Sequence, residues 1–275
     1  MEYRNWQRDK LEKILINVNN KNTAVWCSPI SNKPLLLMIH GIGSDRHDLA
    51  GLAYELSVCY RVAIIELPGH GDSDQVQLPD TISLQIWFKD NLQSITKTIG
   101  EPYIICPHSF GCSAVLSKEI IDKYKIVLIG PVSQPSSLYS SYATIIMKSA
   151  VFWSYIYSWK PFIYIRARSL VHTPGKEARD RVLWAYYNSR SDYSTTKYQA
   201  GLIKILLDHT AYKHASSGKV SLVICGKKDY LVRERDHSSL SKIFGSTKIV
   251  FVDGGHLFPI EAPKSVAKII NLLAN

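Results

Sequence analysis

The chain alternates short apolar runs with helical patterns, and this alternation limits it to a small number of folds. Eight runs of four to six residues, rich in β-branched side chains, are predicted as strands at 13–18, 23–27, 35–39, 62–66, 103–106, 126–129, 220–225 and 248–252. Helices are predicted at 48–57, 82–99, 110–124, 235–244 and 263–273. Strands separated by helices favour a mostly parallel sheet with helices on both faces.

The first connection is the exception to this pattern. Residues 19–22, Asn-Asn-Lys-Asn, join the first two strands. A connection this short suits only an antiparallel pair, because a parallel pair needs a crossover of about a dozen residues or more. We therefore expect an α/β fold whose mostly parallel, eight-stranded sheet starts with an antiparallel pair.

The alternation also stops after residue 131 and resumes at residue 220. We interpret residues 132–215 as a mostly helical cap that is inserted after the sixth strand. The core is then formed by residues 1–131 together with residues 216–275. The chain length suits one large α/β domain with such an insertion.

Aromatic side chains are concentrated in the predicted cap, which holds 15 of the chain's 29. Large aromatic rings suit the wall of an apolar pocket, so Trp153, Trp159 and Trp184 are candidate substrate-binding residues. Packing between the helices of the cap is the alternative interpretation.

Positive charge is concentrated there as well. The net charge is +10, and residues 132–215 contain 11 Lys and Arg against 4 Asp and Glu. Arg166, Arg168 and Arg181 either bind an acidic end of the substrate or form a solvated basic face. No nucleic-acid motif accompanies this charge, so nucleic acid is not an expected partner. Contact of the basic, aromatic cap with an anionic membrane surface stays open.

Several classes of protein are disfavoured by what the sequence lacks. The five cysteines form neither a C-x-x-C motif nor a metal-ligand spacing, and a dinucleotide fingerprint starting at Gly41 would need glycine where Arg46 stands. We therefore expect no metal and no cofactor. The longest apolar stretch, 142–159, is interrupted by Lys148 and three serines, which argues against a transmembrane span. The N-terminus has no signal-peptide pattern, so a cytoplasmic location is expected, as a monomer or a homodimer.

Residues 106–112 read Cys-Pro-His-Ser-Phe-Gly-Cys and directly follow an apolar strand. A serine two residues before a glycine, at a strand-to-helix turn, is typical of an exposed nucleophile in the motif G-x-S-x-G. Ser109 is the candidate nucleophile. Pro107 replaces the leading glycine of the motif. Because proline has no N–H to donate to a neighbouring strand, the substitution puts the rate of catalysis by Ser109 in question.

An activated serine needs a base and an acid that orients the base, and in α/β folds these follow in the order Ser, Asp or Glu, His. Asp229 follows the strand that ends at Cys225, and His256 follows the last strand in Asp-Gly-Gly-His. Catalytic groups gather at this carboxyl edge of a parallel sheet. Ser109, Asp229 and His256 are therefore the predicted catalytic residues.

The same chemistry needs two backbone N–H groups to bind the developing oxyanion. The residue after the serine, Phe110, supplies one, and we assign the other to Ile42 in the glycine-containing loop after the third strand. His40, Gly41 and His108 are adjacent to these groups and are predicted to contact the substrate.

Across nearly its whole length the chain resembles the α/β-hydrolase superfamily, in particular its lidded serine hydrolases. The residues that carry the resemblance are His40-Gly41, Pro68-Gly69-His70-Gly71-x-Ser73, His108-Ser109-Phe110-Gly111, Gly226-x-x-Asp229 and Gly255-His256. The resemblance implies an oxyanion donor in the first motif, a serine nucleophile and a helical cap. A serine in place of aspartate argues against the dehalogenase and epoxide hydrolase branches.

The resulting functional hypothesis is a serine hydrolase that cleaves a carboxylic ester or thioester of a small to medium apolar or aromatic acyl substrate through an acyl-enzyme. Acyl transfer, carbon–carbon bond hydrolysis and lyase chemistry on the same three residues remain alternatives. So does a ligand-binding protein without catalysis, which Pro107 makes a serious alternative.

Overall fold

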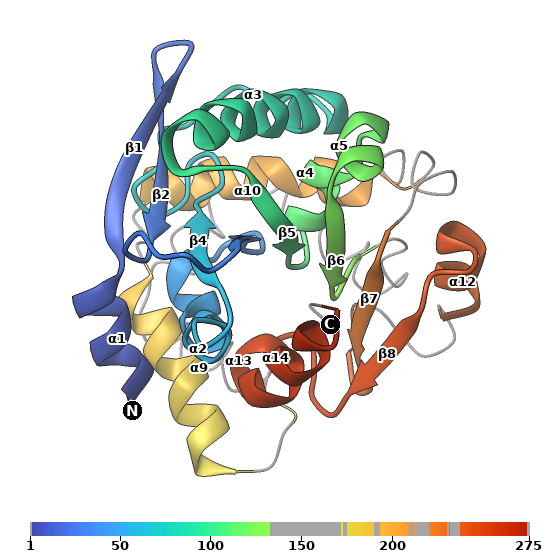
Figure 1. The fold of residues 1–275 in the computed structure, drawn as a ribbon. Coiled ribbons are helices and arrows are strands. Elements are labelled where there is room, and N and C mark those ends of the chain that lie inside the picture. Colours follow the sequence, from blue (N-terminus) through green and yellow to red (C-terminus); the bar gives the residue numbers. More distant parts are fainter. Residues whose placement is uncertain are drawn as a thin grey trace.

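The computed structural model describes residues 2–132, 172, 175–189, 193–208, 212, 220–229, 231 and 237–273. Its centre is one eight-stranded sheet in the order β1-β2-β4-β3-β5-β6-β7-β8 (Figure 1). The strands are β1 (Glu12–Val18), β2 (Lys21–Cys27), β3 (Leu35–Ile39), β4 (Arg61–Ile65), β5 (Pro102–Pro107), β6 (Lys125–Ile129), β7 (Leu222–Gly226) and β8 (Ile249–Val252).

The sheet is mixed at one edge and parallel elsewhere. Strand β2 pairs antiparallel with both β1 and β4, whereas all other neighbours are parallel. The predicted α/β fold with an antiparallel start is therefore confirmed. Each predicted strand ends within two residues of the observed one, because these runs are bounded by turn residues that end strands sharply.

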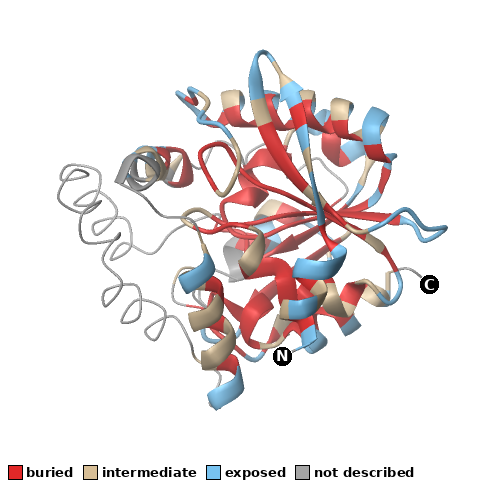
Figure 2. Ribbon diagram, turned by 90° about the vertical axis from the view of Figure 1, so that its left-hand side faces the viewer, coloured by how far each residue is buried: buried red, intermediate tan, exposed pale blue. Residues whose placement is uncertain are grey.

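Both faces of the sheet are buried because successive side chains of a strand point to opposite faces. In β3, Leu35, Leu37 and Ile39 join one apolar cluster, and Leu36 and Met38 join another. Figure 2 shows the strands buried between helices whose outer surfaces are exposed.

The first cluster packs under α3 (Thr81–Ile99), α4 (Gly111–Val115), α5 (Lys118–Lys123), α10 (Tyr193–Leu207) and α12 (His237–Phe244). The second packs under α2 (Arg46–Leu56) and α14 (Pro263–Asn271), with α1 (Glu2–Lys10) and α13 (Phe258–Glu261) beside α2. In Figure 1 these two groups of helices lie on opposite sides of the sheet.

The prediction of one helix over residues 110–124 is wrong. Leu116 leaves the helical conformation with ψ 26°, and Ser117 is extended and caps α5. Serine is a favoured residue at a helix start, which explains the break at this position. Helix α1 was not predicted, and in the structure it packs against α2.

Two helices of the predicted cap are described, α9 (Lys176–Asn188) and α10. Leu202, Ile205 and Leu206 of α10 are buried in the first apolar cluster, and α9 lies against α2 and α13. The limits of the cap at 132 and 215 stay a prediction. No helix in the described ranges is long and apolar enough to cross a membrane.

Pro107 is the last residue of β5, opposite Ile39 of β3. Two residues later the N–H of Ser109 donates to the carbonyl of Ile129 at 2.9 Å, next to the end of β6. Alternate residues of a strand donate to the same side, so an N–H at position 107 would also face β6. The proline therefore gives up one hydrogen bond at the end of the strand, while the following turn still forms.

We predict that Pro107→Gly leaves the rate of any reaction at Ser109 within about twofold, a difference of under about 0.5 kcal/mol in activation free energy. The reason is that the turn at Ser109 already forms with proline in place, as its N–H bond to Ile129 indicates. Initial rates of ester hydrolysis by wild type and variant provide the measurement. A rate increase of tenfold or more in the variant would show that the proline displaces Ser109.

Candidate active site

Three side chains from different strand ends meet at the carboxyl edge of the sheet. The Nε2 atom of His256 lies 2.7 Å from the Oγ of Ser109, and its Nδ1 atom lies 2.7 Å from the Oδ2 of Asp229. A carboxylate only accepts, so Nδ1 carries the proton and Nε2 is the acceptor for the serine hydroxyl. All three side chains are more than nine-tenths buried, which keeps this chain of hydrogen bonds away from competing water.

Ser109 is presented on a sharp turn between β5 and α4, with a φ of 54°. Non-glycine residues rarely adopt this left-handed conformation, and it is often found at functional sites. The turn requires glycine at 111, since a Cβ there would lie 2.7 Å from the carbonyl oxygen of His40.

Asp229 is fixed by the turn after β7. A Cβ at Gly226 would lie 2.4 Å from the carbonyl of Gly255, so the two loops that carry Asp229 and His256 touch through their backbones. The N–H of Lys228 donates to Gly254 at 3.0 Å. The Oδ1 of Asp229 accepts from the N–H of Leu231 at 2.8 Å, which leaves Oδ2 directed at the imidazole.

The loop after β3 approaches the serine closely. A Cβ at Gly41 would lie 3.1 Å from the Cβ of Ser109, so only glycine allows this contact without a shift. Within the described part of the chain, the N–H groups of Ile42 and Phe110 have no acceptor. Phe110 directly follows Ser109, and Ile42 directly follows Gly41, the residue that approaches Ser109.

Two buried histidines hold this loop in place. The N–H of Leu67 donates to His40 Nε2, and the N–H of Gly43 donates to His70 Nε2, each at 3.0 Å. Both rings must therefore carry their proton on Nδ1, which donates to the carbonyl of Gly41 in one case and of Pro68 in the other, each at 2.8 Å. The two rings thus tie the loop after β3 to the loop after β4.

Burial keeps both histidines neutral. It lowers the pKa of His40 to about 4 and that of His70, which also lies beside His40, to about 3. His40 was predicted to contact substrate, but the structure places its ring in the interior with both nitrogens engaged. His70 was assigned no role from the sequence, and its link to the Ile42 loop was missed. A histidine between two glycines after a strand was the available signal.

His108 has a related role at the other side of the serine. Its Nε2–H donates to the carbonyl of His256 at 3.1 Å, and burial lowers the pKa of His108 to about 3. Its Nδ1 has no hydrogen-bond partner among the described residues. The residue before the serine therefore holds the loop that carries His256.

Two of the candidate residues in the predicted cap, Trp184 and Arg181, are described by the structure. Trp184 packs edge-on against Tyr3 and His47, with ring centroids 5.3 Å apart in each pair, so it contributes to packing between α9 and the core. Arg181 is bound to backbone carbonyls of α13 and to Glu177. The other candidates, Trp153, Trp159, Arg166 and Arg168, lie outside the described residues.

Metal-binding geometry is not present in the described ranges: they contain no group of three or more His, Cys, Asp or Glu side chains placed to hold an ion.

The sequence matches the model of the alpha/beta hydrolase family over residues 36–269. The chain therefore belongs to the α/β-hydrolase family. A search of curated proteins finds no match.

Comparison with solved structures gives the same fold. A membrane phospholipase A, described as a bacterial virulence factor, aligns with a TM-score of 0.75 and 16% identity over 99% of this chain and 89% of its own. The enol-lactonase from Burkholderia xenovorans LB400 aligns with a TM-score of 0.75 and 17% identity over 95% and 100%. The thioesterase domain from the curacin biosynthetic pathway aligns with a TM-score of 0.69 and 17% identity over 96% and 100%. At these identities the likeness concerns the fold.

Removal of the backbone strain at Ser109 should raise the free energy of unfolding of the protein. Ser109→Gly should unfold with a free energy about 1 kcal/mol higher than Ser109→Ala, because glycine adopts φ 54° without the steric cost that alanine keeps. Urea unfolding of the two variants, both of which lack the hydroxyl, provides the comparison. Equal stability would mean that the turn relaxes once the hydroxyl is lost.

The buried histidines predict acid sensitivity. In the unfolded chain a histidine takes up a proton near pH 6.5, whereas folded His70 resists protonation down to about pH 3. Stability is therefore complete above pH 6.5 and falls as the pH drops below it, by up to about 1.4 kcal/mol per pH unit for each such histidine.

The variant His70→Gln keeps an acceptor for the N–H of Gly43 but cannot be protonated. We expect its stability to fall less steeply with decreasing pH than that of wild type, by up to about 1.4 kcal/mol per pH unit. Chemical unfolding in a series of buffers from pH 7.5 to pH 5 gives the two slopes. Parallel curves would contradict a neutral, buried His70.

Proposed function

We propose that the protein is a serine hydrolase that cleaves carboxylic esters or thioesters through an acyl-enzyme. The observation that carries this proposal is the continuous chain Ser109, His256, Asp229, with both contacts at 2.7 Å and the serine on a strained turn. Membership of the α/β-hydrolase family supports hydrolysis as the reaction class.

In the proposed reaction the Oγ of Ser109 attacks the carbonyl carbon while its proton passes to Nε2 of His256. Asp229 stays ionised and accepts the Nδ1–H, which stabilises the imidazolium. The imidazolium then protonates the leaving alcohol or thiol, and the acyl group stays on Ser109. Water attacks this acyl-enzyme with His256 again as base, which releases the acid and regenerates the serine.

The negative charge of the tetrahedral intermediate needs fixed donors. The N–H groups of Ile42 and Phe110 are proposed for this role, since neither has an acceptor among the described residues and both flank Ser109. His40 and His70 stay neutral and fix the Ile42 loop through backbone contacts, so the donors need no reorganisation during the reaction.

The proposed substrate carries a small to medium apolar or aromatic acyl group. The concentration of aromatic residues in 132–215 supports an apolar pocket wall. The structural neighbours described as a phospholipase A, an enol-lactonase and a thioesterase domain support ester or thioester chemistry on this fold.

We predict that Ser109→Ala and His256→Ala each reduce turnover of a short p-nitrophenyl ester by about 10³- to 10⁴-fold or more, because each removes a member of the proton path. Asp229→Asn should have an effect of similar size, since an amide no longer selects the Nδ1–H form of His256. A panel of esters and thioesters of increasing acyl length, assayed with wild type and all three variants, provides the measurement.

Ser94→Ala is the matched control, because within the described part of the chain its hydroxyl bonds only to the backbone of its own helix, at 3.3 Å. It should keep wild-type turnover and should still react with a fluorophosphonate probe, with the label found on Ser109 by mass spectrometry. Undiminished turnover in Ser109→Ala would rule out the proposed nucleophile. A wild type that neither turns over the panel nor reacts with the probe would favour a ligand-binding protein.

A further inference from the structure

Glu261 is a buried carboxylate for which the proposed reaction has no direct use. It ends α13, the short helix that begins two residues after His256, and its side chain is within the protein interior at 2% exposure. A buried carboxylate is costly unless hydrogen bonds compensate for the lost water. The contacts of Glu261 therefore indicate what this residue does.

Its two oxygens bind backbone groups from two different parts of the fold. Oε1 accepts from the N–H of Gly255 at 3.1 Å, and Oε2 accepts from the N–H of His172 at 2.9 Å. Gly255 directly precedes His256, whereas His172 belongs to the predicted cap. One carboxylate thus joins the loop of the candidate base to the segment that follows the sixth strand.

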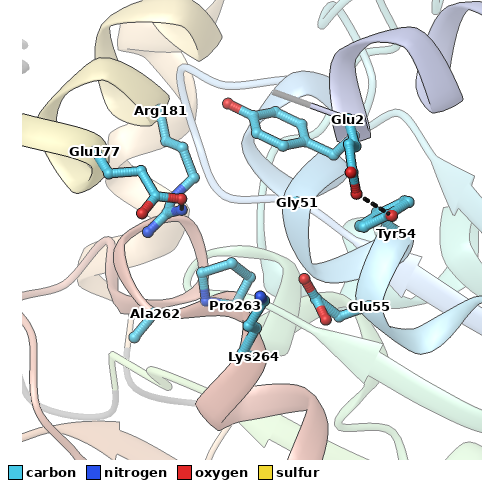
Figure 3. A pocket seen from close by; sticks show the side chains of 10 residues that line it. Glu2, Gly51, Tyr54, Glu55, Glu177, Arg181, Ala262, Pro263 and Lys264 are labelled. Atoms are coloured by element: carbon cyan, nitrogen blue, oxygen red, sulfur yellow. Dashed lines mark hydrogen bonds and ion pairs between the residues drawn. The ribbon is translucent and has the colours of Figure 1, made fainter.

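Helix α9 binds the same short helix from the cap side. The guanidinium of Arg181 donates to the carbonyls of Ile260 at 2.9 Å and of Glu261 at 2.7 Å. Carbonyls at the end of a helix lack partners within the helix, so they are open to such donors. Figure 3 shows Arg181 reaching from α9 toward the turn at Ala262 and Pro263, with Glu177 beside it at the edge of a cleft.

Apolar packing completes the junction. Val182 and Ala185 of α9 form a small cluster with Leu257 and Ile260, and Leu257 directly follows His256. The residue before the candidate base, the residue after it and the helix that follows are all in contact with cap residues or with Glu261.

We infer that Glu261 is a positioning residue that makes the placement of His256 depend on the docking of the cap. This inference rests on the proposed function, since it assigns the consequence of cap docking to the base of that reaction. Displacing the cap removes the His172 and Arg181 contacts from the turn that carries His256. The base is then held less firmly against Ser109.

The test compares Glu261→Ala, Glu261→Gln and Arg181→Met with Glu177→Gln as the matched control. Glu177 lies on α9 and pairs with Arg181, but its side chain is 75% exposed. Glu261→Ala should lower kcat/KM for a short ester about 10- to 100-fold, as expected for a small displacement of a catalytic group, with most of the loss in kcat. Glu261→Gln, which keeps one acceptor oxygen, should retain part of the activity.

A second readout does not depend on turnover. The proton between His256 Nδ1 and Asp229 gives a downfield NMR resonance, assigned by its loss in Asp229→Asn. We expect this resonance to broaden or shift in Glu261→Ala and in Arg181→Met, and to stay unchanged in Glu177→Gln. Because it reports on the placement of His256 directly, it tests the coupling even if wild type shows no esterase activity and the proposed function fails.

A purely structural role for Glu261 predicts a different result. Glu261→Ala would then lose thermal stability while kcat and the downfield resonance stay at their wild-type values, which would overturn the inference. If Glu261→Ala does not fold, Glu261→Gln and Arg181→Met decide the question. Wild-type kcat and an unchanged resonance in both variants would refute the coupling.

Discussion

The close approach of two backbones at the carboxyl edge of the sheet is the constraint on which the site depends. The turn at Ser109 and the loop at His40 touch so tightly that neither Gly111 nor Gly41 has room for an ordinary side chain. This contact places the loop after β3 against the turn that carries the Ser109 hydroxyl. A third contact, between Gly226 and Gly255, does the same for the carboxylate and the imidazole. Much of the geometry at this edge of the sheet therefore depends on glycines, which have no side chain.

Neutral histidines form hydrogen bonds with the backbone throughout this region. An imidazole that is buried and uncharged offers one donor and one acceptor in fixed directions, which a lysine or a carboxylate does not. His40 and His70 use this property to connect two loops, and His108 uses its donor to hold the loop of His256. The fourth histidine of the group, His256, has the same pattern but faces a hydroxyl and a carboxylate, and so is suited to accept and return a proton.

The sequence permitted good prediction of the sheet and of the residues that meet at its edge, for a physical reason. Strand ends in a parallel sheet converge, so Ser109, Asp229 and His256 could be expected together once each was seen to follow a strand. The helix α1 and the packing role of Trp184 were not predictable in this way. They depend on contacts between residues far apart in the chain, which local patterns do not encode. The same holds for Glu261, whose partners His172 and Arg181 lie 89 and 80 residues earlier in the chain.

The connection between β6 and β7 has a consequence for how such proteins diversify. The two strands are parallel neighbours, with Ile129 opposite Ile224, so the chain that leaves the carboxyl end of β6 must return to the amino end of β7. The entropy of closing a loop grows only with the logarithm of its length, so a longer or shorter insertion changes the stability of the core little. We therefore expect that the main requirement on the stretch between β6 and β7 is to keep its contacts with α13. Arg181 and the backbone of His172 make these contacts.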